Sequence, residues 1–404
     1  MANPLAPIHL VCGFALAACA WIAPALAIDR IVNNTQVAGD GVCDTHCSLR
    51  DAIDAAVPGQ DVVRFDPSVF STPQIIGSGS RVFSIPFDKS LTVIGPGRDL
   101  LTLHNGTIRD VNPSSAHAYD IRGLTFYSSN GFWVRSGASA RFEDVRFSAP
   151  DPFSDAAIWV QSGNLTVSMC EFVNISSFMN GGGISQDIGT LNVNNSSFKN
   201  SFAGDAGGIY TRAQNPSIIG NTFEGNSSFN HGGAIHVANA IKAEIGNNTF
   251  YGNASGGLGA AIFAEGSTST LAAYNNTIIN NIGSAAAIYS ESPTVLALIA
   301  NNIIALNIDG ANAPLPAFGG SGLNVDHDNI TSATNLNLGP LTDNGGLTRT
   351  MALLDGSSAI GVGDPTICNR APINRIDQRG FTRHICDAGA YASTPEDVFA
   401  DSFE

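Results

Sequence analysis

Charged side chains are scarce in this chain of 404 residues, and basic side chains are scarcer than acidic ones. Only 13% of the residues are charged, and 19 Lys and Arg stand against 34 Asp and Glu, which gives a net charge of -15. A chain of this charge repels the phosphate backbone of nucleic acids and the headgroups of anionic lipids. We therefore expect no nucleic-acid partner.

Apolar residues are not scarce, since they make up 44% of the chain. Gly, Asn, Ser and Thr fill the spaces between short apolar segments, and Gly alone occurs 43 times. This composition is typical of many short strands joined by tight turns.

Lys and Arg are also missing ahead of the apolar segment that runs from residue 8 to residue 27. The segment ends in Ala25-Leu26-Ala27, the small-x-small pattern at which signal peptidase cleaves. We predict a signal peptide at residues 1–27, a secreted or outer-surface location, and no membrane span in the mature chain. Leu16-Ala17-Ala18-Cys19 leaves a second route open, in which Cys19 is lipidated.

Five cysteines follow the predicted signal peptide, which is an odd number: Cys43, Cys47, Cys170, Cys368 and Cys386. We expect disulfides Cys43–Cys47 and Cys368–Cys386, because an exported chain folds in an oxidising compartment. A Cys-x3-Cys spacing also suits a metal, but no second pair of ligands lies near it in the sequence. We predict no metal site and no cofactor.

An internal repeat of about 26 residues organises the chain between residues 130 and 290. One apolar position recurs at intervals of 25 to 27 residues, at Phe132, Ile158, Ile184, Ile209, Ile235, Ile262 and Ile288. A second ladder keeps the same step, at Phe147, Phe172, Phe198, Phe223, Phe250 and Ile278. Two ladders with one period indicate a single stacked unit.

The repeat unit is too short, and too rich in β-branched residues, Gly and Asn, to be a helical hairpin. It predicts a coil of short strands, stacked about 4.8 Å from the next coil so that both ladders become internal stacks. The expected fold is all-β: a single-stranded right-handed parallel β-helix of the pectin-lyase-like kind.

Asparagines recur near the expected turns, where Asn tolerates left-handed backbone and forms side-chain ladders. They are Asn195, Asn221, Asn226, Asn248, Asn253, Asn276 and Asn301. Cys170 takes the ladder position that Ser196 and Asn221 hold in later coils. We therefore predict that Cys170 is a buried and unreactive thiol.

The N-terminal end is predicted to be closed by a short amphipathic helix. Ser48-Leu49-Arg50-Asp51 is a capping-box pattern, and Leu49, Ala52, Ile53 and Ala56 follow at helical spacing. The segment Cys47-Ser48-Leu49-Arg50-Asp51-Ala52-Ile53, after Gly39-Asp40-Gly41, resembles the C-S-L-R-E-A-I signature of many exported bacterial β-helix proteins. Asp51 replaces the usual Glu of that signature.

Residues 339–392 resemble the module known as a choice-of-anchor Q domain. The matching pieces are Gly339-Pro340-Leu341-Thr342-Asp343-Asn344-Gly345-Gly346, Leu354-Asp355-Gly356-Ser357-Ser358-Ala359-Ile360, Asp377-Gln378-Arg379-Gly380 and Asp387-Ala388-Gly389-Ala390-Tyr391. Gly361 stands where the family usually has Asp. The resemblance implies an exported or surface β-helix protein and no particular reaction.

These observations predict an N-terminal cap at residues 28–60, a parallel β-helix at residues 61–338, the C-terminal module as a cap at residues 339–392, and an acidic tail at residues 393–404. The closing Asp397-Val398-Phe399-Ala400-Asp401-Ser402-Phe403-Glu404 is similar to short tails on other exported bacterial proteins.

Two outward rows are expected beside the first ladder, because strand side chains alternate. The first row holds Trp133, Trp159, Ser185, Tyr210, His236, Phe263 and Tyr289. The second holds Arg135, Gln161, Asp187, Arg212, Ala238, Glu265 and Glu291. Aromatic rings beside charged groups suit a polysaccharide, because the rings pack on apolar sugar faces while polar groups meet hydroxyls. The predicted ligand contacts are the aromatic side chains of the first row, including His236, together with Arg135. The alternative is that these rings only stabilise the sheet through cross-strand contact.

Candidate catalytic residues also fall in register. Glu265 and Glu291 lie on adjacent coils, where two carboxyls could share hydrolytic roles. Asp205 and His231 share another register, with Arg212 on the coil of Asp205, which suits a lyase. The paired Asp motifs, His-Gly and Arg-x-Lys expected of pectate lyases and polygalacturonases are missing. We expect glycan binding or adhesion, with a polysaccharide lyase or glycoside hydrolase and a passive structural surface protein as alternatives.

Overall fold

The structure is a computed structural model that describes residues 28–77, 83–87, 89–104, 106–110, 116–128, 131–135, 137–149, 156–266, 270–291, 296–321 and 328–393. The predicted signal peptide, Cys19 and all of the predicted tail except Ser393 lie outside the described residues.

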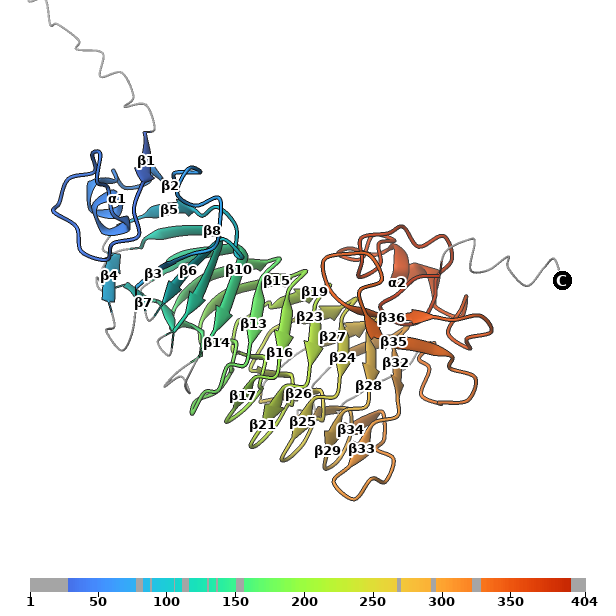
Figure 1. The fold of residues 1–404 in the computed structure, drawn as a ribbon. Helices are drawn as coiled ribbons and strands as arrows, with labels where there is room; N and C mark the ends of the chain where they lie inside the picture. The colour runs from blue at the N-terminus through green and yellow to red at the C-terminus, as the bar shows by residue number, and fades with distance from the viewer. Residues whose placement is uncertain are drawn as a thin grey trace, which may run out of the picture.

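The described chain winds into a parallel β-helix (Figure 1). One sheet of ten strands takes one strand from each successive coil of the described residues. In stacking order these strands are β4 (Phe83–Phe87), β7 (Gly106–Asp110), β9 (Phe132–Val134), β11 (Ile158–Val160), β14 (Ile184–Gln186), β18 (Ile209–Thr211), β22 (Ile235–Ala238), β26 (Ile262–Glu265), β30 (Ile288–Ser290) and β34 (Phe318–Gly320).

A larger sheet of 19 described strands covers the other side of the core and takes two strand positions from most coils. Its strands are β1 (Asp29–Val32), β2 (Val62–Phe65), β3 (Gln74–Ile76), β5 (Leu91–Ile94), β6 (Leu101–His104), β8 (Ala118–Tyr127), β10 (Ala138–Ser148), β12 (Gly163–Ser168), β13 (Glu171–Val173), β15 (Gly189–Asn194), β16 (Ser197–Lys199), β19 (Ser217–Ile219), β20 (Thr222–Glu224), β23 (Ala243–Gly246), β24 (Thr249–Tyr251), β27 (Thr270–Tyr274), β28 (Thr277–Ile279), β31 (Leu296–Ala300) and β32 (Ile303–Ala305).

A narrow third sheet lies between these two sheets along the chain and contains five described strands. They are β17 (Phe202–Ala203), β21 (Ser227–Ser228), β25 (Ala254–Ser255), β29 (Ile282–Gly283) and β33 (Ile308–Asp309). None of the helices in the described part of the chain is both long and apolar enough to cross a membrane.

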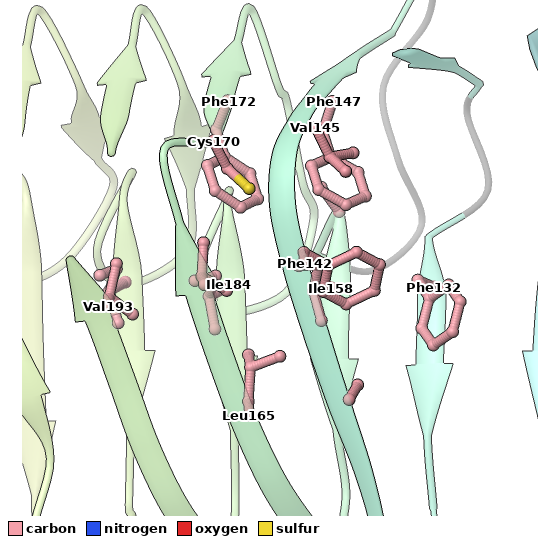
Figure 2. Close-up of a cluster of buried hydrophobic side chains, with 14 of the residues drawn as sticks. Phe132, Phe142, Val145, Phe147, Ile158, Leu165, Cys170, Phe172, Ile184 and Val193 are labelled. Atoms are coloured by element: carbon pink, nitrogen blue, oxygen red, sulfur yellow. The ribbon is translucent and has the colours of Figure 1, made fainter. Parts of the chain in front are cut away.

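Both predicted ladders are continuous stacks inside the coils. Ile158 pairs in register with Phe132 and Ile184, and the same register continues to Ile288 and Phe318. The rings of the second ladder lie 4.5 to 5.0 Å apart from Phe147 to Phe250 and are nearly parallel. Figure 2 shows part of this core, with Phe147 and Phe172 on neighbouring coils. Stacked rings add to the free energy of burying apolar area, so the repeat itself forms the core.

Asparagine has two distinct structural roles at the corners of the coil. Asn195 and Asn301 have positive φ angles of 49° and 55°, which Asn accepts at low cost. The residue that follows each such position points inward and forms a ladder. One ladder contains Asn221, Asn248, Asn276, Asn302 and Asn329, and the other contains Asn226, Asn253, Asn281 and Asn307.

Each ladder amide satisfies backbone groups that the corner leaves without strand partners. The side-chain oxygen of Asn253 accepts hydrogen bonds from the backbone N–H and the side-chain amide of Asn226, at 3.0 and 2.9 Å. Its own side-chain nitrogen donates to the Phe223 carbonyl at 3.0 Å. An unpaired buried polar group costs about 1–3 kcal/mol. The ladders avoid this cost at the corners, because they pair the backbone groups there.

Cys170 takes the position that Ser196 and Asn221 hold in the next two coils, as predicted. Its backbone N–H donates to Ser196 Oγ at 3.1 Å, and its side chain is buried beside Phe172 (Figure 2). Burial raises the pKa of the thiol to about 12. The thiol is therefore un-ionised at neutral pH and unreactive.

The N-terminal end is covered by α1 (Leu49–Ala55), and the predicted capping box is present. Ser48 Oγ accepts from the Asp51 N–H at 3.2 Å, and Asp51 Oδ2 accepts from the Ser48 N–H at 3.1 Å. Leu49, Ala52 and Ile53 are buried against the first coils. The predicted disulfide between Cys43 and Cys47 is formed just ahead of this helix.

The C-terminal module contains an antiparallel pair, β35 (Leu338–Thr342) and β36 (Thr350–Leu353), and the short helix α2 (Pro365–Asn369). It lies along the outer face of β20, β24, β28 and β32, at the C-terminal end of the solenoid (Figure 1). Gln378 bonds to Thr222 and Thr249 on successive coils, and Arg383 donates to Asn247.

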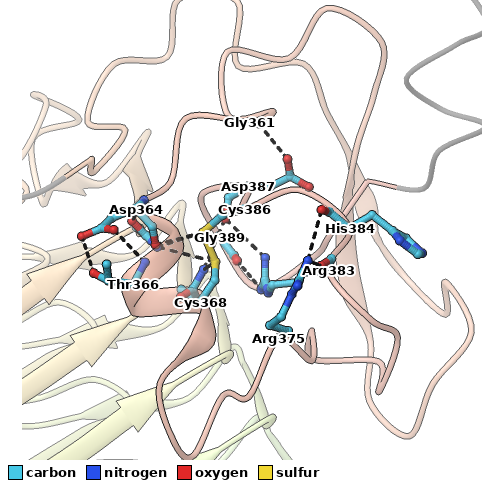
Figure 3. Close-up of a disulfide and its surroundings, with 12 residues drawn as sticks. Gly361, Asp364, Thr366, Cys368, Arg375, Arg383, His384, Cys386, Asp387 and Gly389 are labelled. Carbon is cyan, nitrogen blue, oxygen red and sulfur yellow. Dashed lines mark hydrogen bonds between the residues drawn. A yellow bond between two sulfur atoms is a disulfide. The ribbon is translucent and has the colours of Figure 1, made fainter.

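The predicted disulfide between Cys368 and Cys386 joins α2 to the loop that carries Arg383 and Asp387 (Figure 3). Gly361, at the position where the resembled family has Asp, has a φ of 69° and donates its N–H to Asp387 at 2.7 Å. A side chain is disfavoured at that φ angle, so glycine suits this turn.

We expect Asn253→Ala to destabilise the solenoid by about 2–4 kcal/mol, because the substitution leaves the Asn226 N–H and the Phe223 carbonyl without partners. Denaturation in urea, followed by circular dichroism, measures the loss. The exposed Asn215 makes no side-chain hydrogen bond among the described residues, and Asn215→Ala is the matched control. Equal midpoints for the two variants would contradict the role given to the ladder.

Candidate functional site

The outward row of the ten-stranded sheet is in register from coil to coil. Trp133 pairs with Trp159, Trp159 with Ser185, and Ser185 with Tyr210. The row continues through His236 and Phe263 to Tyr289. Trp133, Trp159, Tyr210 and Tyr289 are partly exposed at this surface.

Two of the predicted ligand contacts are not available to a ligand. His236 is 2% exposed and Phe263 is fully buried, so both predictions were wrong. Phe263 is enclosed by other rings: His231 stacks on it at 4.6 Å, His236 meets it edge-on at 4.8 Å, and Tyr289 lies 6.1 Å away. At this point of the row the cross-strand alternative is correct, because the rings bury one another.

A hollow of about 270 Å³ opens where the row has a small residue, between Trp159 and Tyr210. Ser185, the residue between them in the stack, is only 7% exposed and leaves room that a third ring would fill. The hollow is also lined by Asp187, Arg212, Met179, Asn180 and Ala156. Two aromatic rings therefore flank a space with a polar edge.

The polar edge of the hollow contains groups of both charges. Burial raises the pKa of Asp187, although the nearby Arg212 opposes the rise. Burial likewise raises the pKa of Tyr210. On the other side, the Arg135 guanidinium lies 4.4 Å from the Trp133 ring centre and 5.5 Å from that of Trp159. Arg135 thus holds the Trp pair by cation–π contact.

A charged cluster lies next to the hollow, below Tyr210. His236 is placed between two carboxylates: its Nε2 is 3.2 Å from Glu265 Oε1, and its Nδ1 is 3.6 Å from Asp205 Oδ1. Burial alone would lower the pKa of His236, but the two carboxylates raise it above its ordinary value. The two carboxylates therefore favour the protonated imidazole, and its ring meets the Tyr210 ring edge-on at 4.9 Å.

The same cluster changes the roles predicted for the acids. His236 lowers the pKa of Glu265, which does not favour a protonated Glu265 in the hydrolytic pair predicted with Glu291. Burial alone would raise the pKa of Asp205, but His236 brings it below the ordinary value. Neither carboxyl group of the cluster is protonated at neutral pH, so neither is a general acid there.

The structure brings Asp205 and His231 together, but through the backbone. The His231 N–H donates to Asp205 Oδ1 at 3.1 Å, and the Leu258 N–H donates to His231 Nδ1 at 3.0 Å. Arg212 is exposed and lines the hollow with Asp187, away from the predicted lyase pair. Among the described residues, no group of three or more His, Cys, Asp and Glu side chains is arranged to hold a metal ion.

Comparison with known families supports the fold alone. A family model described as a right handed beta helix region matches residues 108–260. This segment includes the hollow and most of the charged cluster. No curated protein matches the sequence.

The match and the stacked coils establish the fold predicted from the repeat, a right-handed parallel β-helix. Pectin lyases and hydrolases use the same fold. Because one fold carries many functions, the function has to be argued from the site.

We expect stability to depend on pH through His236. A raised folded pKa means that the contribution of His236 is complete below its ordinary value of 6.5 and is lost as pH rises through the folded value. The lowered pKa values of Asp205 and Glu265 mean that their contribution is lost instead as pH falls below about 4. The cluster therefore stabilises most at about pH 5–6.

His236→Gln tests this dependence. The variant should lose about 1–2 kcal/mol at pH 6 and less at pH 9, because charge-assisted contacts are worth about this much in a partly buried cluster. Urea denaturation at both pH values measures the difference. The exposed His46→Gln is the control, and an equal loss for His236→Gln at both pH values would show that the charge is unimportant.

Proposed function

We propose that the outer face of β9, β11, β14 and β18 binds a polysaccharide, with the hollow between Trp159 and Tyr210 as the central subsite. The observation that carries this proposal is the pair of partly exposed aromatic rings, two coils apart, on either side of Ser185. Aromatic rings pack on the apolar faces of sugars, and their edges stay available to water and hydroxyls.

The spacing of the rings supports an extended chain of sugars. Adjacent strands lie about 4.8 Å apart, so Trp159 and Tyr210 are about 10 Å apart along the solenoid, which is comparable to two sugars of an extended polymer. Ser185, Asp187 and Arg212 offer hydrogen bonds to hydroxyl groups along that path. Charges of both signs suit a hydroxyl-rich ligand.

The charged cluster supports binding in preference to cleavage. A hydrolase needs one protonated carboxyl group opposite an ionised one, and both carboxylates around His236 have lowered pKa values. The cluster instead supports the Tyr210 ring, because His236 packs edge-on against it. We further propose that the chain is exported and presents this face outside the cell, where disulfides such as Cys43–Cys47 persist.

The test is incubation of residues 28–404 with acidic and neutral polysaccharides, followed by measurement of both retention and new chain ends. Trp159→Ala and Tyr210→Ala should each weaken retention at least tenfold, since each removes a stacking ring worth about 1.4 kcal/mol or more. Tyr289→Ala is the matched control, because Tyr289 lies in the same row outside the hollow.

Three results would overturn the proposal. Release of unsaturated or reducing ends that is lost in Asp205→Ala or Glu265→Ala would make the protein a lyase or hydrolase. Absence of retention on every polysaccharide would favour a passive structural protein. Equal weakening by Tyr289→Ala would show that the hollow is not the subsite.

A further inference from the structure

A second hollow, of about 520 Å³, lies between the β-helix and the C-terminal module, away from the polysaccharide face. Tyr251, Ile279 and Leu306 line it from the coils. Leu338, Leu341 and Met351 line it from β35 and β36. Its volume falls in the range of small-molecule sites, about 300–1,000 Å³, and such sites often lie where two units meet.

Leu306 is an unusual residue for its place in the repeat. Its φ is 59°, in the left-handed region, and the equivalent turn residues of the five preceding coils are Asn174, Asn200, Gly225, Gly252 and Asn280, all with positive φ. Asn and Gly take this conformation at low cost, whereas leucine is strained there.

Burial does not compensate Leu306 for this strain, because the side chain is 52% exposed. Turn geometry would favour asparagine, and folding would favour a covered leucine. What Leu306 does supply is an apolar wall at the rim of the hollow. Strained residues that the fold does not require are concentrated at binding sites.

One end of the hollow is charged. Arg349 Nη1 lies 2.6 Å from Glu224 Oε2, and Lys199 Nζ lies 3.5 Å from the other oxygen of Glu224. These three groups carry one net positive charge. Glu224 and Arg349 line the hollow and Lys199 lies outside its lining beside Glu224, while the other lining residues from the coils and from β35 and β36 are neutral. The net positive charge therefore lies at this one end of a mostly apolar hollow.

We propose that this hollow binds an amphiphile with one carboxylate and an unbranched hydrocarbon chain. The carboxylate lies at Arg349, where it balances the net charge, and the chain lies against Tyr251, Leu306 and Met351. Arg349 already donates to Glu224 and to the Leu341 carbonyl, but a neutral apolar ligand would leave the net positive charge of this end uncompensated, and a polyanion would meet Glu224. The proposal does not depend on polysaccharide binding.

Isothermal titration of the purified chain with decanoate and octanoate tests the proposal. Decanoate binds saturably, and octanoate binds about tenfold more weakly, because it buries two fewer methylene groups. Leu306→Asn places the residue of the neighbouring coils at this turn, so it should raise the thermal midpoint while it weakens decanoate at least tenfold. Ile282→Asn is the matched control, since Ile282 is 38% exposed on a neighbouring coil and does not line the hollow.

The chemistry of the head is tested with decanol and with Arg349→Gln. Decanol should bind the wild type at least tenfold more weakly than decanoate, and Arg349→Gln should remove that preference. Saturable binding that is unchanged in Leu306→Asn, or no decanoate binding at about 1 mM, would overturn the proposal. The proposal would also be overturned if decanoate did not bind and the chain instead self-associated, or bound a peptide of residues 394–404, in a way that Leu306→Asn abolishes.

Discussion

The rest of this structure depends on the need to satisfy every backbone N–H and C=O group at the corners of a flat coil. Along the strands the neighbouring coils supply partners, but at a corner the chain turns away from them. The inward asparagines, such as Asn248 and Asn253, supply the missing donor and acceptor from one coil to the next. Because each amide must meet an equivalent amide one coil away, the length of each coil can vary only outside the corners.

That constraint explains how a surface of local shape can be built on such a regular body. Because the register is fixed, the residue after each ladder position always points outward. A change of residue size at one position of the row therefore opens or fills a hollow at that coil. Ser185 makes a hollow between two rings, whereas Phe263, two coils beyond Tyr210, closes the surface. The same body thus offers an open hollow between aromatic rings and, beside it, the ion cluster of His236, Asp205 and Glu265, in which His236 packs edge-on against Tyr210.

The sequence predicted the features that repeat and missed those that depend on one coil. The ladders, the two disulfides, the buried Cys170 and the capping box of Ser48 follow from spacing or local chemistry. Spacing cannot say whether a ring in the outward row is covered, so His236 and Phe263 were misplaced. Two features of the sequence could have pointed to the site. Ser185 is the one small residue of the predicted row, which indicates the hollow. His236 follows Tyr210 in the row, and the coil of Tyr210 also carries Asp205, which indicates the ion cluster. The place of the C-terminal module depends on contacts such as Gln378 with Thr249, which no local pattern reports.

The asparagine ladders do not extend over the whole solenoid. They begin after Cys170 and Ser196 and continue to Asn329 and Asn307. In the described coils before Cys170, strand pairing and apolar packing are joined instead by charged side chains, such as Arg98 at the Met169 carbonyl and Arg146 at Glu171. The C-terminal module clamps the same, laddered half, through Gln378 and Arg383. The two halves therefore differ in what resists separation of the coils: the C-terminal half has continuous amide ladders and the clamp of the module, and we expect a pull on both ends to separate coils of the N-terminal half first.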